Sequence, residues 1–96
     1  MERRVVITGL GAITPIGKDV AETWKGIENK TCGIDEISLF DASTFKTKFD
    51  AEVKDYDPLV YFEPKEAKRF DRSSQFAIIA AREAMQDSGI TTENTN

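Results

Sequence analysis

The chain has 96 residues, which is enough for one small domain with a single core. Hydrophobic residues make up 40% and charged residues 31%, a composition typical of a globular protein and not of a disordered one. The formal net charge of −4 argues against a nucleic-acid partner, and because no apolar run approaches about 18 residues we expect no membrane insertion.

The first predicted elements are a strand, a turn and a helix. Three consecutive β-branched residues predict a strand over 4–8, buried in a mostly parallel sheet. Glycine and proline then predict a turn over 9–17. Asp19, with Glu22 three residues later, has the spacing of a helix N-cap. The helix that it begins has an apolar stripe made of Val20, Trp24 and Ile27, and Gly33 ends any continuation.

The middle of the chain is expected to contain less regular structure. Residues 34–47 show no sustained period and are interpreted as an irregular connection. Residues 48–53 alternate, which predicts a half-exposed strand with Phe49, Ala51 and Val53 on its buried side. Pro64 suits the first position of a short helix that runs through Arg69 or Phe70.

The last helix is the strongest prediction from the pattern. Ser73 or Ser74 is expected to cap it, and Gly89 is expected to end it. Residues 76–81 are apolar on every side, so the helix must be enclosed by other elements. Because 96 residues offer little mass to enclose it, we expect the chain to be part of a larger protein.

The glycine-rich turn raises the question of nucleotide binding, because phosphate sites often follow a strand in this way. Gly9 and Gly11 fit the dinucleotide fingerprint, but Thr14 stands at its third glycine and Pro15 removes a backbone donor. A related threonine–glycine pattern fails at Ile13 and Pro15. The residues therefore disfavour a dinucleotide-binding oxidoreductase and favour a turn that packs backbone closely.

Several segments resemble one known family in register. Residues 3–17 (RRVVITGLGAITPIG) resemble the opening of the β-ketoacyl-acyl-carrier-protein synthases, in particular the type II elongating enzymes of bacterial fatty-acid synthesis. Further matching motifs are TWKGI (23–27), FDASTFKTKF (40–49), KEAKRFD (65–71) and AMQDSG (84–89). The resemblance covers almost the whole chain.

The resemblance implies an α/β chain that forms the N-terminal portion of a thiolase-type fold, layered αβαβα in a full-length homodimer. Residues 1–96 would be the first part of the first half, with the remainder absent. The implied enzyme is an acyltransferase that joins an acyl thioester to malonyl-carrier by decarboxylative Claisen condensation. A polyketide ketosynthase or a non-catalytic chain-length factor remains an alternative. The chain itself is expected to bind no cofactor or metal, since phosphopantetheine arrives on the acyl carrier protein.

The catalytic residues of that family are expected to lie elsewhere. Its cysteine and two histidines fall beyond position 96, and this chain has no histidine. Cys32 lies in NKTCGID, which does not resemble the nucleophile motif, and it lacks an imidazole partner. We therefore expect the chain alone to be inactive. A single thiol, which cannot form an internal disulfide, favours the cytoplasm.

One cluster of charges is a candidate binding site. Lys65, Lys68 and Arg69 are spaced to share one face of a helix, with Glu66 and Asp71 nearby. On an otherwise acidic protein these residues would ordinarily form a solvated surface. The family resemblance implies instead that they dock the acidic acyl carrier protein, with a salt-sensitive contribution to association.

Overall fold

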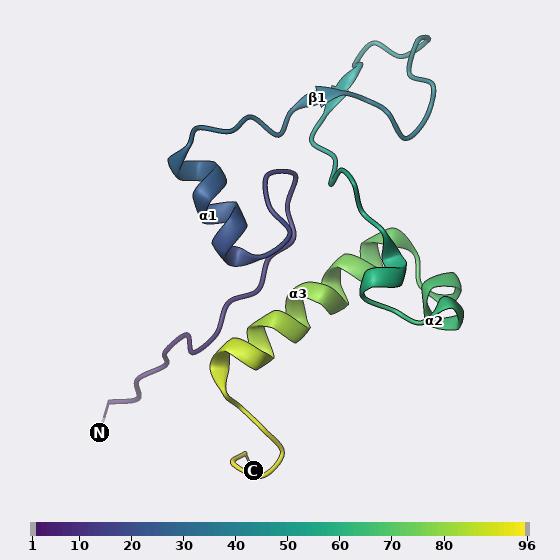
Figure 1. Cartoon of the computed structure of the whole chain (residues 1–96). Coiled ribbons are helices and arrows are strands. Elements are labelled where there is room, and N and C mark those ends of the chain that lie inside the picture. The colour runs from purple at the N-terminus through teal and green to yellow at the C-terminus, as the bar shows by residue number, and fades with distance from the viewer. Residues whose placement is uncertain (1, 96) are drawn as a thin grey trace.

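The computed structural model describes residues 2–95, and one long helix, α3, runs through its middle (Figure 1). The elements in chain order are α1 (Val20–Glu28), β1 (Asp35–Glu36), β2 (Phe49–Asp50), the 3-10 helix η1 (Pro58–Val60), α2 (Pro64–Arg69) and α3 (Arg72–Ser88). The radius of gyration is 17.0 Å, against about 13 Å expected for a globular domain of this size. Among the described residues the buried apolar side chains are Ala42, Phe62 and Ile79. The chain therefore encloses very little core of its own.

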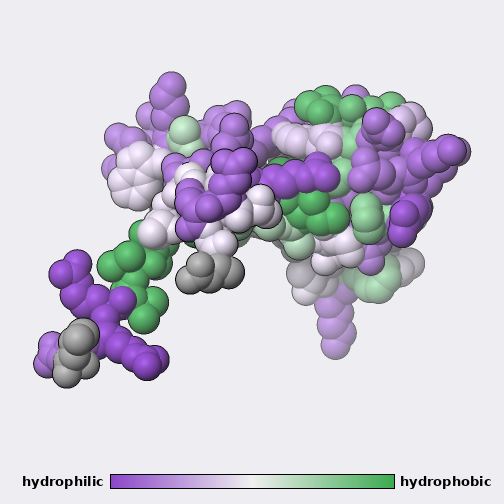
Figure 2. Space-filling view, turned by 90° about the horizontal axis from the view of Figure 1, so that it is seen from below, coloured by the Kyte–Doolittle hydropathy of each residue, from purple (hydrophilic) through white to green (hydrophobic). Residues whose placement is uncertain are grey.

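The strand predicted over 4–8 is wrong for this chain. Its residues belong to no strand, and Val5 and Ile7 are 96% and 83% exposed. Figure 2 shows a hydrophobic stretch on the arm that stands away from the rest of the surface. A strand needs a neighbour to pair its backbone groups, and within residues 2–95 the sheet consists of β1 and β2 alone.

The turn predicted over 9–17 is present and tight. Thr14 and Gly17 exchange two backbone hydrogen bonds of 2.7 and 3.2 Å, with Pro15 and Ile16 between them. A Cβ added at Gly11 would lie 1.8 Å from the Ala80 carbonyl oxygen on α3. This confirms that the glycines allow backbone to pack against a helix.

Helix α1 begins as predicted, because the Asp19 carboxylate accepts the Glu22 N–H at 2.7 Å. It ends at Glu28, with Asn29 as C-cap, before Gly33 is reached. Two residues of its apolar stripe, Trp24 and Ile27, are more than half exposed. The stripe therefore has no complete partner among the described residues.

The segment of residues 34–53 folds back as a short antiparallel hairpin, in which Asp35 pairs with Asp50 and Glu36 with Phe49. The alternation predicted over 48–53 has the wrong phase: Glu52 is buried, whereas Phe49 is 58% exposed. The physical reason is that the Glu52 carboxylate accepts the Ser38 and Leu39 N–H groups and the Ser38 hydroxyl.

Helices α2 and α3 are separated by Phe70 and Asp71 alone. Pro64 is the first residue of α2, as expected, and the helix ends at Arg69. The cap predicted for α3 is wrong: Asp71, not Ser73 or Ser74, is the N-cap, because its carboxylate accepts the Ser74 N–H at 2.7 Å. The predicted end is confirmed by Gly89, which takes a left-handed φ of 70°.

Candidate docking site

The three predicted docking residues lie on α2, beside the N-terminal end of α3 (Figure 1). Lys65, Lys68 and Arg69 are all exposed, and Lys68 and Arg69 occupy the last turn, where positive charge suits the helix dipole. The Arg69 guanidinium lies 5.7 Å from the centre of the Phe70 ring. The structure thus brings the three together on one outward-facing surface.

Aromatic side chains pack at both ends of α2. Phe62, which is buried, lies 6.3 Å from Phe70 between ring centres. On α3, Arg82 places its guanidinium 5.1 Å from the Phe62 ring and donates to the Tyr61 carbonyl at 3.3 Å. The sequence did not indicate this support, because Arg82 lies 21 positions from Tyr61.

A buried amide also reaches α2 from α3. The Gln75 side chain is 5% exposed, and its nitrogen donates to the carbonyls of Ala67 and Phe70, both at 3.0 Å. Its oxygen accepts the Tyr56 hydroxyl at 2.6 Å. Sequence reasoning missed Gln75; the one available signal was a polar residue directly before the apolar run of residues 76–81.

Carboxylates of α3 accept two backbone N–H groups of the glycine-rich turn, those of Leu10 and Ala12. Glu83 of α3 accepts the Ala12 N–H at 2.8 Å and the Val20 N–H at 3.1 Å. Asp87 accepts the Leu10 N–H at 3.0 Å. A phosphate site would leave such donors free for an anion, and carboxylates at the same position repel one. The geometry therefore agrees with the packing interpretation and not with nucleotide binding.

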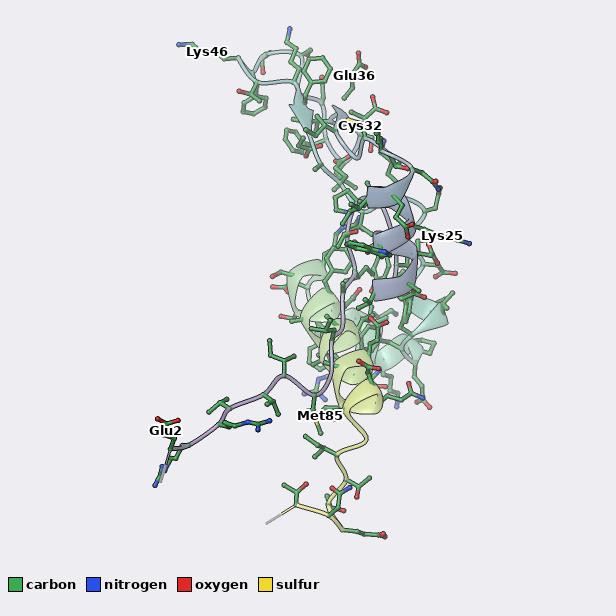
Figure 3. All side chains as sticks on the ribbon, turned by 90° about the vertical axis from the view of Figure 1, so that its left-hand side faces the viewer. Glu2, Lys25, Cys32, Glu36, Lys46 and Met85 are labelled. Atoms are coloured by element: carbon green, nitrogen blue, oxygen red, sulfur yellow. The ribbon has the colours of Figure 1, made fainter. Side chains whose placement is uncertain are left out.

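Cys32 lies between α1 and the hairpin (Figure 3). It is exposed, and its thiol donates to the Ile34 carbonyl at 3.7 Å. The chain has no histidine to act as a base. The thiol therefore has no imidazole partner of the kind that activates a cysteine nucleophile.

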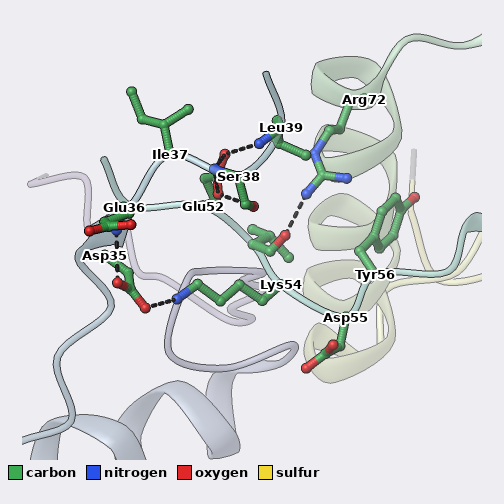
Figure 4. Close-up of a pocket in the computed structure, with 11 residues that line it drawn as sticks. Asp35, Glu36, Ile37, Ser38, Leu39, Glu52, Lys54, Asp55, Tyr56 and Arg72 are labelled. Carbon is green, nitrogen blue, oxygen red and sulfur yellow. Dashed lines mark hydrogen bonds and ion pairs between the residues drawn. The ribbon is translucent and has the colours of Figure 1, made fainter. Parts of the chain in front are cut away.

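A polar cleft of about 650 Å³ lies between the hairpin and α3 (Figure 4). Two of its charged side chains are engaged: Lys54 donates to the Asp35 carboxylate at 3.0 Å, and Arg72 donates to the Val53 carbonyl. The hydrogen bond from Lys54 lowers the pKa of Asp35. Desolvation raises the pKa of Asp50, whereas the Ser38 hydroxyl, opposed in part by desolvation, lowers that of Glu52. The hydrogen bond from Arg72 links the hairpin segment to the first residue of α3.

Residues 2–95 contain neither a candidate membrane span nor a candidate metal cluster. No helix there is long and apolar enough to cross a membrane. In the same part of the chain, no group of three or more Asp, Glu, Cys or His side chains is arranged to hold a metal ion.

Comparison with known proteins identifies the family. The model of the β-ketoacyl synthase N-terminal domain matches residues 2–96. The chain belongs to the β-ketoacyl synthase family, as the sequence motifs indicated.

Curated relatives within this family are similar to the chain in sequence. The 3-oxoacyl-[acyl-carrier-protein] synthase 2 of Coxiella burnetii is 42% identical over 95 residues, and that of Synechocystis is 43% identical over 95 residues. Each alignment covers 99% of this chain and 23% of the relative. The chain therefore spans about a quarter of the length of the curated relatives it matches.

Solved structures confirm the predicted fold class. The ishigamide ketosynthase/chain length factor superposes with a TM-score of 0.83 at 33% identity, covering all of this chain and 24% of that one. A type II polyketide ketosynthase in complex with its acyl-carrier protein gives a TM-score of 0.71 at 25% identity, covering all of this chain and 25% of that one. The chain has the fold of the N-terminal part of a thiolase-type ketosynthase.

Proposed function

We propose that this chain is the N-terminal segment of a 3-oxoacyl-[acyl-carrier-protein] synthase and that it supplies part of the docking surface for the acyl carrier protein. The proposal rests on one observation above all. The family model matches residues 2–96 of this chain. Within that match, Lys65, Lys68 and Arg69 are exposed on α2, whose C-terminal end is bound by the Gln75 side chain of α3. Partners of opposite charge associate faster on such a surface.

The reaction of the whole enzyme places the chemistry outside this segment. An enzyme thiolate takes the acyl group from the phosphopantetheine thiol of the carrier, malonyl-carrier loses carbon dioxide, and the resulting carbanion attacks the acyl thioester. The thiolate, and the donors that stabilise the developing oxyanion, belong to residues beyond 96 in the proposed protein. The segment contributes carrier recognition, in a cytoplasmic homodimer that needs no bound cofactor.

The isolated chain is accordingly proposed to be inactive. It has no histidine, and Cys32 has no base to activate it. Incubation with acyl-carrier and malonyl-carrier should give no 3-oxoacyl product above background. Product formation by the purified 96-residue chain would overturn this part of the proposal.

A second candidate function is favoured by the solved neighbours. One superposed structure is named for a type II polyketide acyl-carrier protein with its ketosynthase, and the other for a ketosynthase/chain length factor. In that case the same basic face of α2 would receive a polyketide carrier. Assay of the full-length protein with fatty acyl-carrier and polyketide acyl-carrier substrates separates the two functions, and a chain-length factor would be inactive with both.

The docking assignment is tested by reversing the three charges in the full-length enzyme. Changing Lys65, Lys68 and Arg69 to glutamate should raise KM for carrier-bound substrate tenfold or more, which corresponds to about 1.4 kcal/mol. Turnover of a small pantetheine thioester, which needs no docking surface, should stay nearly unchanged. A matched control reverses Lys25, Lys46 and Lys48, which are also exposed but lie on α1 and the hairpin segment. Equal loss of rate with both substrates would show that α2 is only structural.

A further inference from the structure

Helix α2 is too short to hold its own orientation. It has six residues, and isolated helices below about 12 residues are marginal in water. Its N-cap, Glu63, makes no side-chain capping hydrogen bond. The direction in which α2 presents its side chains must therefore be set by contacts with other elements.

Gln75 supplies such a contact at the C-terminal end of α2. The last carbonyls of a helix have no partner within the helix itself. The Gln75 amide nitrogen donates to two carbonyls there, those of Ala67 and Phe70, both at 3.0 Å. One side chain of α3 thus acts as a C-cap for a different helix. Because Gln75 is only 5% exposed, water cannot easily replace it.

The orientation of the Gln75 amide is fixed by Tyr56. The phenol donates to the amide oxygen at 2.6 Å, so the nitrogen must face the two carbonyls; the flipped amide would set oxygen against oxygen. Tyr56 is held in turn by the Phe76 ring at 4.9 Å and the Arg72 guanidinium at 5.3 Å. The Tyr56 hydroxyl is a donor at neutral pH, because a phenol with the ordinary pKa of about 10 is protonated there.

We propose that Gln75, oriented by Tyr56, is a positioning residue for carrier docking: it clamps the C-terminal end of α2 and so preorganises the basic face formed by Lys65, Lys68 and Arg69. This inference rests on the proposed function of that face. A clamped helix presents its charges together, whereas a loosened one presents them only for a fraction of the time, and the apparent affinity falls by that fraction.

The first test is Gln75→Met in the full-length enzyme, a change that keeps side-chain length and removes all three hydrogen bonds. If α2 is then correctly placed about a fifth of the time, KM for carrier-bound substrate rises about fivefold. Turnover of a pantetheine thioester stays unchanged. Ile79→Ala is the matched control, since it removes buried apolar volume one turn further along α3. It should lower Tm without changing the ratio of the two KM values.

Tyr56→Phe is the milder variant, because it leaves Gln75 in place and removes the hydroxyl that orients the amide. It should raise the carrier KM less than Gln75→Met does. If Gln75→Met fails to fold, Tyr56→Phe decides the question. An unchanged carrier KM in Tyr56→Phe would then overturn the proposal, and a selective rise would support it.

A double-mutant cycle separates this inference from the function on which it rests. Gln75→Met is combined with alanine at Lys65, Lys68 and Arg69. If Gln75 acts by presenting those charges, its effect on the carrier KM disappears in the neutralised background. An effect of the same size in both backgrounds would overturn the positioning role. If neutralising the three residues leaves the carrier KM unchanged by itself, the docking function fails as well.

Discussion

Residues 2–8 and residues 9–17 adjoin in the sequence, yet they differ in how they are held. The first segment is apolar at Val5, Val6 and Ile7, and these side chains lie in solvent. The second segment is fixed to α3 by backbone N–H groups that donate to Glu83 and Asp87. Gly9 and Gly11 lie so close to α3 that a Cβ could not be added without movement, and Gly17 lies equally close to α1.

The contrast shows that hydrogen bonds to the backbone and burial of apolar side chains need different amounts of surrounding structure. Carboxylates on a single helix, α3, are enough to accept backbone N–H groups of the turn. Burial of a Val or Ile side chain, worth about 1.5–3 kcal/mol, needs a surrounding layer, and residues 2–95 provide none around residues 5–7. The same difference separates α2, clamped by Gln75, from the half-covered stripe on α1.

The largest expected effect is that of Gly11→Ala. The new methyl group would lie 1.8 Å from the Ala80 carbonyl oxygen, so the turn must move away from α3. We expect a loss of about 3 kcal/mol or more. Gly89→Ala is the control: nothing lies near its Cβ, and only its positive φ costs about 1 kcal/mol. Urea unfolding of the full-length protein, followed by circular dichroism, measures both changes, and equal losses would show that the turn is not closely packed.

A smaller effect is expected for Glu83→Gln. The carboxylate accepts two N–H groups, from Ala12 and Val20, whereas an amide offers one oxygen and turns a donor toward the other N–H. The free energy of unfolding should fall by about 1–2 kcal/mol in the same urea experiment. Glu93→Gln, in the exposed C-terminal tail, serves as the control and should change nothing. An unchanged value for Glu83→Gln would mean that the carboxylate does not hold the turn.

The hairpin should respond to acid through Glu52. The Ser38 hydroxyl and the backbone N–H groups of Ser38 and Leu39 lower its pKa in the folded state, and Lys54 acts in the same direction. The stabilisation is therefore present above the ordinary glutamate value of 4.5 and is lost as pH falls through the lower folded value. We expect the amide signals of Ser38 and Leu39 in NMR spectra to shift in that range, and to stay constant in Glu52→Gln. A midpoint above 4.5 would contradict the assignment.

The smallest effect on folding is expected for the exposed segment of residues 2–8. Changing Val5 and Ile7 to lysine should leave the helical circular dichroism of the isolated chain unchanged, because neither side chain is buried. The unchanged chain should self-associate through its exposed apolar surface, and the double variant should do so less. Analytical ultracentrifugation measures this. A monodisperse wild-type chain with a sharp cooperative melt would show that the chain forms a complete core after all.

The sequence predicted features that depend on neighbouring residues better than features that depend on distant partners. Features determined within a few residues were predicted correctly: the Asp19 cap, Pro64 at the start of α2 and Gly89 at the end of α3. The packing role of the glycine turn also followed from Pro15, because a missing N–H is incompatible with a phosphate cradle.

Features that depend on distant partners were not predictable. The strand over 4–8 was expected from its β-branched residues, but a strand forms only where another pairs with it. The phase of residues 48–53 was inferred from apolar alternation, and the hydrogen bonds from Ser38 to Glu52 override it. Of the candidate site, the sequence supplied the three basic residues and missed Gln75, whose contacts carry no local signature.

The central claim, that α2 receives the acyl carrier protein, is tested most directly by the association rate constant of carrier with the full-length enzyme as salt is raised. For the wild type the rate should fall steeply with ionic strength, since the screening length shrinks from about 10 Å at 0.1 M to about 3 Å at 1 M. Reversing Lys65, Lys68 and Arg69 should lower the rate at low salt and flatten this dependence. The matched reversal of Lys25, Lys46 and Lys48 should keep the wild-type slope. Identical slopes for the two triple variants would contradict docking on α2.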